Sequence, residues 1–108
     1  MTTTKTYQKR SCQRVPSSLV VKFLNAGSVS YGIASNISEK GMRIHTGVCL
    51  PRDSRSDIEI PIKDEQLKVP ASVVWVEKTG GFYDSMGVEL LNPPKKYLQI
   101  VESFKNLY

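Results

Sequence analysis

The chain has 108 residues, a length that suits one domain with a modest hydrophobic core. Hydrophobic residues make up 40% of the chain and charged residues 23%, which excludes a disordered polyelectrolyte. The net charge of +5 favours an anionic partner, and at this level nucleic acid, a nucleotide and an acidic membrane surface all remain open.

Three further features narrow the class of protein. Two cysteines, Cys12 and Cys49, indicate a reducing compartment and not a disulfide scaffold. No apolar run reaches the length of a membrane span and the N-terminus is polar, so we expect neither membrane insertion nor a signal peptide. The single histidine, His45, has no metal-ligating partners at a useful spacing. These features predict a soluble cytoplasmic protein without a metal or other cofactor.

The first seventeen residues make a basic arm. They include Lys5, Lys9, Arg10 and Arg14 and no acidic residue, and they carry no apolar stripe. Two arginines four residues apart on a polar segment are well suited to hold an anion, because a guanidinium group keeps its charge and grips phosphate with two parallel hydrogen bonds. From spacing alone, solvated charge on a terminus is the simpler interpretation. We assign residues 1–17 to a flexible arm.

Six short runs with a period of two follow the arm. They predict strands at residues 18–23, 28–38, 42–45, 57–63, 67–76 and 82–90, with turns between them. Short strands at regular spacing favour a small closed antiparallel barrel, which we place at residues 18–91. The fold class is therefore mainly β.

Alternation within the second run assigns its two faces. The apolar side chains that share one parity, and that we expect to face the core, are Val29, Tyr31, Ile33 and Ile37. The same parity places Asn36 and Ser38 next to each other on the outer face.

The later strands carry two informative residues. In the fifth run, Trp75 shares the parity of Val73, which predicts that it faces the core, while Val74 and Val76 lie on the opposite face. Gly87 interrupts the sixth run at a point where a backbone or a bulky side chain can approach closely.

Residues 92–108 predict a C-terminal helix packed on the barrel. Asn92 suits the N-cap and Pro93 the first helical position, and Tyr97, Val101 and Phe104 recur at helical spacing. We expect this helix to cover one barrel opening or the outer apolar face of the fifth strand.

Two short patterns together carry a resemblance. They are Arg10-xxx-Arg14 and Asn36-Ile37-Ser38-Glu39-Lys40-Gly41, and either alone is weak. In this order, separated by one strand and a turn and ahead of the barrel-like strands, they resemble the PilZ family of cyclic di-GMP receptors. The resemblance extends to residues 41–44, 73–75 and 86–90 and to the helix.

The resemblance implies a role for each matching residue. Arg10 and Arg14 would hold the phosphates and guanine edges of cyclic di-GMP, Asn36 and Ser38 would bind a guanine and the sugar-phosphate ring, and Gly41 would shape the turn. These roles suit the side chains, because arginine pairs with phosphate and with the Hoogsteen edge of guanine, and asparagine offers a donor and an acceptor.

Two further cations are accessory candidates. Lys9 stands where members of the family often carry another arginine. Lysine keeps the positive charge but lacks the planar guanidinium group that stacks on a base, so the binding of one ligand and the binding of an intercalated pair remain alternatives. Arg43 lies on an outward parity nearby, where a surface position is the simpler interpretation.

The leading hypothesis is a receptor that orders its arm on binding cyclic di-GMP and signals to a downstream protein effector. A small barrel that binds nucleic acid is the second hypothesis, disfavoured because the sequence shows few aromatic residues clustered for base stacking. A ligand-independent interaction adaptor is the third. We predict no enzyme, because we find no catalytic pairing, metal cluster or phosphate-cradling glycine loop, and we assign no catalytic residue.

Overall fold

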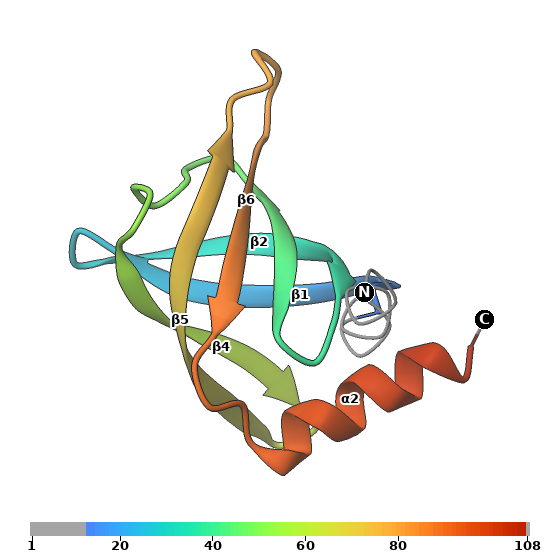
Figure 1. Ribbon diagram of the computed structural model, residues 1–108. Helices are drawn as coiled ribbons and strands as arrows, with labels where there is room; N and C mark the ends of the chain where they lie inside the picture. Colours follow the sequence, from blue (N-terminus) through green and yellow to red (C-terminus); the bar gives the residue numbers. More distant parts are fainter. Residues whose placement is uncertain (1–12, 108) are drawn as a thin grey trace, which may run out of the picture.

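The computed structural model describes residues 13–107, which form six strands and one helix (Figure 1). The elements are β1 (Val15–Asn25), β2 (Ser28–Ile37), β3 (Gly41–Thr46), β4 (Arg55–Ile62), β5 (Glu65–Glu77), β6 (Asp84–Leu90) and α2 (Lys95–Lys105). Residues 15–17, which the sequence assigned to the arm, therefore belong to the first strand of the barrel.

The strands close into a barrel in the order β1-β2-β3-β6-β5-β4, and each neighbouring pair is antiparallel. Closure is made by a short contact between β1 and β4, where Lys22 pairs with Glu59 and Phe23 with Ile58. The predicted fold class, a six-stranded antiparallel barrel with a C-terminal helix, is confirmed.

Apolar side chains from all six strands fill the barrel. Its largest fully buried members include Phe23, Ile44, Ile58, Ile60 and Met86. Along most of β1, β4 and β5 these positions alternate with less buried ones, because successive side chains of a strand point to opposite faces. For β1, β3 and β4 the inward faces are those that the alternation predicts.

The inward face predicted for β2 is wrong over most of its length. Val29, Tyr31 and Ile33 are each at least half exposed, whereas Ala34 and Ile37 are fully buried. The pairing with β3 shifts register between Ala34 and Asn36, so one extra residue enters the strand there. A bulge of this kind switches which parity faces the core, and a single parity cannot hold across it.

A second irregularity corrects the prediction for Trp75. The register between β5 and β6 shifts between Val73 and Trp75. After the shift, Val76 packs against the core and Trp75 lies on the outer face, half-buried. The predicted core position of the only tryptophan is therefore wrong.

The helix α2 covers one opening of the barrel, which is one of the two placements expected from the sequence (Figure 1). Its buried residues, Tyr97 and Val101, join the core. The predicted N-cap is wrong: the cap is Pro94, without a side-chain hydrogen bond, and Asn92 adopts a left-handed backbone with φ of 54°. Within residues 13–107 no helix has the length and apolarity needed to cross a bilayer.

Candidate functional site

The turn between β2 and β3 is held by the hydroxyl of Ser38. Its Oγ accepts hydrogen bonds from the backbone N–H groups of Gly41 and Lys40, at 3.2 and 3.3 Å, and the backbone N–H of Ser38 donates to the carbonyl of Gly41 at 2.8 Å. Serine commonly holds a turn in this way. The side chain is only 2% exposed, which corrects the predicted outer position of Ser38 beside Asn36.

Gly41 is required at this turn by the close approach of β6. A Cβ at position 41 would overlap the carbonyl oxygen of Val88. Gly41 does not have a positive φ, so conformational freedom is not the reason for glycine here. Glycine is needed here because the backbone of β6 lies so close, and the role of Gly41 at a ligand site stays a prediction.

Tyr97 of α2 joins the helix to the same turn. Its hydroxyl donates to the carbonyl of Ser38 at 2.7 Å and lies 3.4 Å from the carbonyl of Gly41. The ring is fully buried, and burial raises the pKa of Tyr97 well above its ordinary value, while the charge of Arg14 acts in the opposite direction. The neutral phenol is therefore a fixed donor that anchors the turn to the helix.

Arg14 and Asn36 are the predicted site residues that meet directly. The Nη1 atom of Arg14 donates to Oδ1 of Asn36 at 3.0 Å on the exposed side of the barrel. The contact joins the chain just before β1 to the β2 bulge. Because Arg14 is exposed and Asn36 is only half-buried, the hydrogen bond contributes little to stability, and both side chains are accessible to a ligand.

A row of paired residues begins at Asn36 on β2 and crosses the three strands beside it, β3, β6 and β5. Asn36 pairs with Arg43 of β3, Arg43 with Gly87 of β6, and Gly87 with Trp75 of β5. The ring of Trp75 lies against Gly87, where a Cβ would overlap the indole, so the predicted close approach at Gly87 is confirmed. We call this row of four residues on the outer face the floor.

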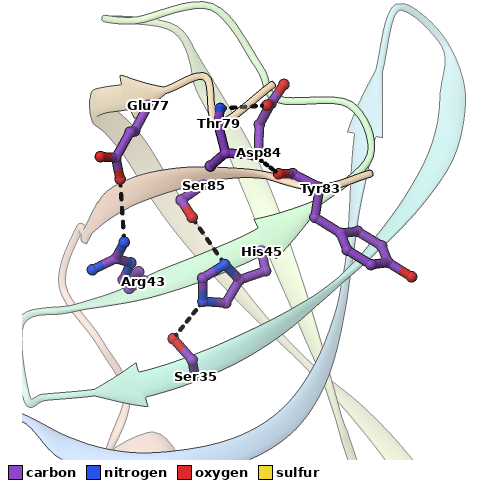
Figure 2. A network of polar contacts seen from close by, with 8 residues as sticks. All are labelled: Ser35, Arg43, His45, Glu77, Thr79, Tyr83, Asp84 and Ser85. Atoms are coloured by element: carbon purple, nitrogen blue, oxygen red, sulfur yellow. Dashed lines mark hydrogen bonds and ion pairs between the residues drawn. The ribbon is translucent and has the colours of Figure 1, made fainter. Parts of the chain in front are cut away.

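Arg43 occupies the middle of this floor. Its guanidinium lies 5.5 Å from the centre of the Trp75 ring, and Nη2 donates to Oε1 of Glu77 at 3.2 Å (Figure 2). Among the described residues its Nε–H is buried and has no hydrogen-bond partner. The floor thus combines a planar cation with an aromatic ring, two groups that stack on flat bases.

A cavity of about 300 Å³ lies beside the turn. It is lined by Arg14, Ser38, Lys40, Gly41, Val74, Val88 and Glu89. The predicted residues Arg14, Ser38 and Gly41 are therefore brought to one hollow, while Arg10 and Lys9 lie outside the described residues. Sequence reasoning missed the part played by Trp75, because only the bulge at Val74 turns it outward.

No cluster of three metal-ligating side chains exists within residues 13–107. His45 instead lies between two serine hydroxyls, with Nε2 3.0 Å from Ser35 and Nδ1 2.8 Å from Ser85 (Figure 2). This row of polar contacts borders the floor on β3.

Comparison with known structures shows the same fold in three proteins. The PilZ domain of YcgR from Escherichia coli, solved with c-di-GMP, superposes with a TM-score of 0.71 at 16% identity, covering 92% of this chain and 93% of that chain. The PilZ domain of CeSA from a cellulose-synthesizing bacterium has a TM-score of 0.58 at 16% identity, covering 88% and 97%.

The third is the Bacillus subtilis inhibitor of motility, MotI/DgrA, with a TM-score of 0.69 at 18% identity over 87% of this chain. The present chain covers 48% of that protein, about half its length. No curated protein sequence matches. The model of the PilZ domain family matches residues 8–105. The match covers nearly the whole sequence, including both short motifs, and the chain belongs to the PilZ domain family.

Proposed function

We propose that this protein is a non-enzymatic receptor for cyclic di-GMP that passes its bound state to a protein effector. The observation that carries the proposal is the contact of Arg14 with Asn36 at the edge of the floor made by Arg43 and Trp75. The family assignment supports the same ligand class, since the YcgR domain of similar fold was solved with c-di-GMP.

Each part of the site suits one part of a cyclic dinucleotide. Two phosphate charges call for arginines, and Arg14, together with Arg10, supplies them. Asn36 offers a donor and an acceptor to a base edge, and the half-buried pair of Arg43 and Trp75 offers a flat surface for a base. Ser38 and Gly41 fix the turn that borders the ligand.

Electrostatics favour capture of the ligand by the arm. Four of the fifteen basic residues lie within the first fourteen residues and no acidic residue accompanies them, whereas the remaining residues hold eleven basic and ten acidic side chains. Positive charge is therefore concentrated in this stretch of the sequence, and Arg14, which belongs to it, contacts Asn36, so the proposed site attracts an anion. Binding would fix Arg10 and Arg14 against the barrel, and this change would present a new surface to the effector.

Calorimetric titration of the full chain with cyclic di-GMP tests the proposal. We expect saturable binding, with GTP as the control ligand, and a stoichiometry that separates one ligand from an intercalated pair. Replacing Arg14 with alanine removes about two charge-assisted hydrogen bonds of roughly 1.5–3 kcal/mol each. The affinity should fall by on the order of 100-fold or more.

Arg55→Ala is the matched control, since Arg55 is an exposed arginine on β4, outside the floor. Equal affinities of the wild type and Arg14→Ala would contradict the assignment, and absence of any binding heat would favour the ligand-independent adaptor. The nucleic-acid alternative predicts binding to any long polyanion with a steep loss of affinity as salt rises.

A further inference from the structure

Six apolar or aromatic side chains stand uncovered on one outer side of the barrel. They are Val20 and Leu24 of β1, Val29, Tyr31 and Ile33 of β2, and Tyr83, which precedes β6. We call these six residues the apolar face. Each side chain is between 50% and 65% exposed. A hollow of about 390 Å³ lies among Val20, Tyr31, Ile33 and Tyr83, bordered by His45.

The size of the apolar face is that of a protein interface. Side chains of this kind at half exposure or more present on the order of 100 Å² each, so the six together offer about 600 Å², against roughly 800 Å² per partner in a standard interface. Apolar patches of this extent on a soluble chain mark association sites. The six described strands close into a barrel, and association through the apolar face needs no free sheet edge.

The arrangement of the face is self-complementary. Val20 pairs with Ile33 and Leu24 pairs with Val29, and these two aliphatic pairs lie on either side of Tyr31, which faces Lys22. A two-fold axis through the central pair would place Val20 and Ile33 of one copy on Leu24 and Val29 of the other. Packed sheets lie about 10 Å apart, and aliphatic pairs of this size fill that space.

The charge on the face gives no preference for a charged partner. Lys22, opposite Tyr31, is the ionic side chain that pairs directly with the face, and its ammonium lies 3.6 Å from the carboxylate of Glu59 on β4. The barrel as a whole is nearly balanced, because the excess of basic residues lies in the first fourteen residues. Two copies can therefore meet without strong repulsion, whereas a polyanion or an acidic peptide would find no complementary charge here.

We propose that the apolar face is the interface of a two-fold symmetric dimer of this chain. Each copy contributes the same six residues, as an isologous interface requires. The Arg43–Trp75 floor lies outside the face, so the dimer leaves the proposed ligand site open on both copies. The proposal does not depend on cyclic di-GMP binding.

Sedimentation velocity of the full chain over about 1–500 μM tests the dimer. We expect a shift from one copy to two with a dissociation constant on the order of 10–100 μM, the weak end for an interface of this area. Ile33→Asp should stay monomeric throughout, because a carboxylate beside Val20 would be buried in the interface without a partner. Leu98→Asp, an exposed position on α2, should dimerise like the wild type.

A second measurement does not rely on the charged variants. With Cys12 and Cys49 replaced by serine, a short bismaleimide should cross-link Tyr31→Cys into a dimer, because packed sheets lie about 10 Å apart, and it should not cross-link Leu98→Cys. A wild type that stays monomeric at every concentration overturns the proposal, as does a dimer unaffected by Ile33→Asp. If a labelled oligonucleotide binds the wild type and Ile33→Asp abolishes that binding, the apolar face is a nucleic-acid site and the dimer proposal is also overturned.

Failure of the dimer and failure of the receptor are separable. Ile33→Asp should bind cyclic di-GMP with the affinity of the wild type, since its side chain is not part of the floor or the turn. Arg14→Ala should dimerise normally.

Discussion

The hydroxyl of Tyr97 gives the sharpest test of how the helix and the site are joined. Tyr97→Phe removes one donor and changes nothing else in the shape of a fully buried ring. The carbonyl of Ser38 then loses its 2.7 Å hydrogen bond while it remains inside the protein. Leaving a buried acceptor without its donor costs roughly 1–3 kcal/mol, so the free energy of unfolding at neutral pH should fall by about that amount.

The difference between the two proteins should also depend on pH. Burial raises the pKa of Tyr97 in the folded state above its ordinary value near 10. As the pH rises past about 10, the unfolded chain therefore loses this proton before the folded chain does. The free energy of unfolding of the wild type then falls by up to roughly 1.4 kcal/mol per pH unit from this group. Phenylalanine carries no such proton, so the gap between Tyr97→Phe and the wild type should narrow.

Urea unfolding followed by the fluorescence of the single tryptophan, Trp75, measures both effects. The two proteins are compared at pH 7.5, 9.5 and 10.5, and other groups that titrate in this range cancel in the difference. Tyr83→Phe is the control, since Tyr83 is exposed, and it should match the wild type at each pH. Equal stability at pH 7.5, or a gap that stays constant up to pH 10.5, would refute the role given to this hydroxyl.

Two further substitutions test the turn and the floor. Ser38→Ala removes the acceptor for two N–H groups of the turn, so the free energy of unfolding should fall by about 1 kcal/mol and the melting temperature by roughly 4–8 °C in a thermal scan. The control Ser56→Ala, at a partly exposed position, should leave the melting temperature unchanged. An unchanged melting temperature in Ser38→Ala would show that the turn does not need the hydroxyl. Gly87→Ala places a methyl group where the indole of Trp75 lies, so the ring should move into water and the tryptophan emission should shift to longer wavelength. An emission spectrum identical to that of the wild type would contradict the packing of Trp75 on Gly87.

The predictions that succeeded rest on local pattern. Alternation located all six strands, because one buried face imposes a period of two on the chain. Gly87 was singled out as a point of close approach, and the ring of Trp75 occupies the space that a side chain would need. One strand boundary was wrong: the sixth strand was predicted to begin at Phe82, but Phe82 lies before β6 and is 96% exposed.

The predictions that failed depend on neighbours in space. The bulges near Ser35 and at Val74 are properties of pairing with β3 and β6, and no residue in the sequence announces them. Each bulge reverses the faces of its strand, which exposed Tyr31 and turned Trp75 towards Arg43. The alternation predicted for β2 also fails at Ser38, because β2 ends at Ile37 and the next residue enters the turn.

Residue types were enough to predict the barrel class, to locate the positive charge in the first fourteen residues, and to reveal the short motifs that resemble the family. These are encoded in residue type and spacing along the chain. Two features came from the folded molecule alone: Arg43 and Trp75 form one floor with Asn36, and Tyr97 of α2 secures a turn 59 residues before it. Those contacts join strands and a helix distant in sequence, and their geometry is set by strand register and helix packing, which exist only once the chain has folded.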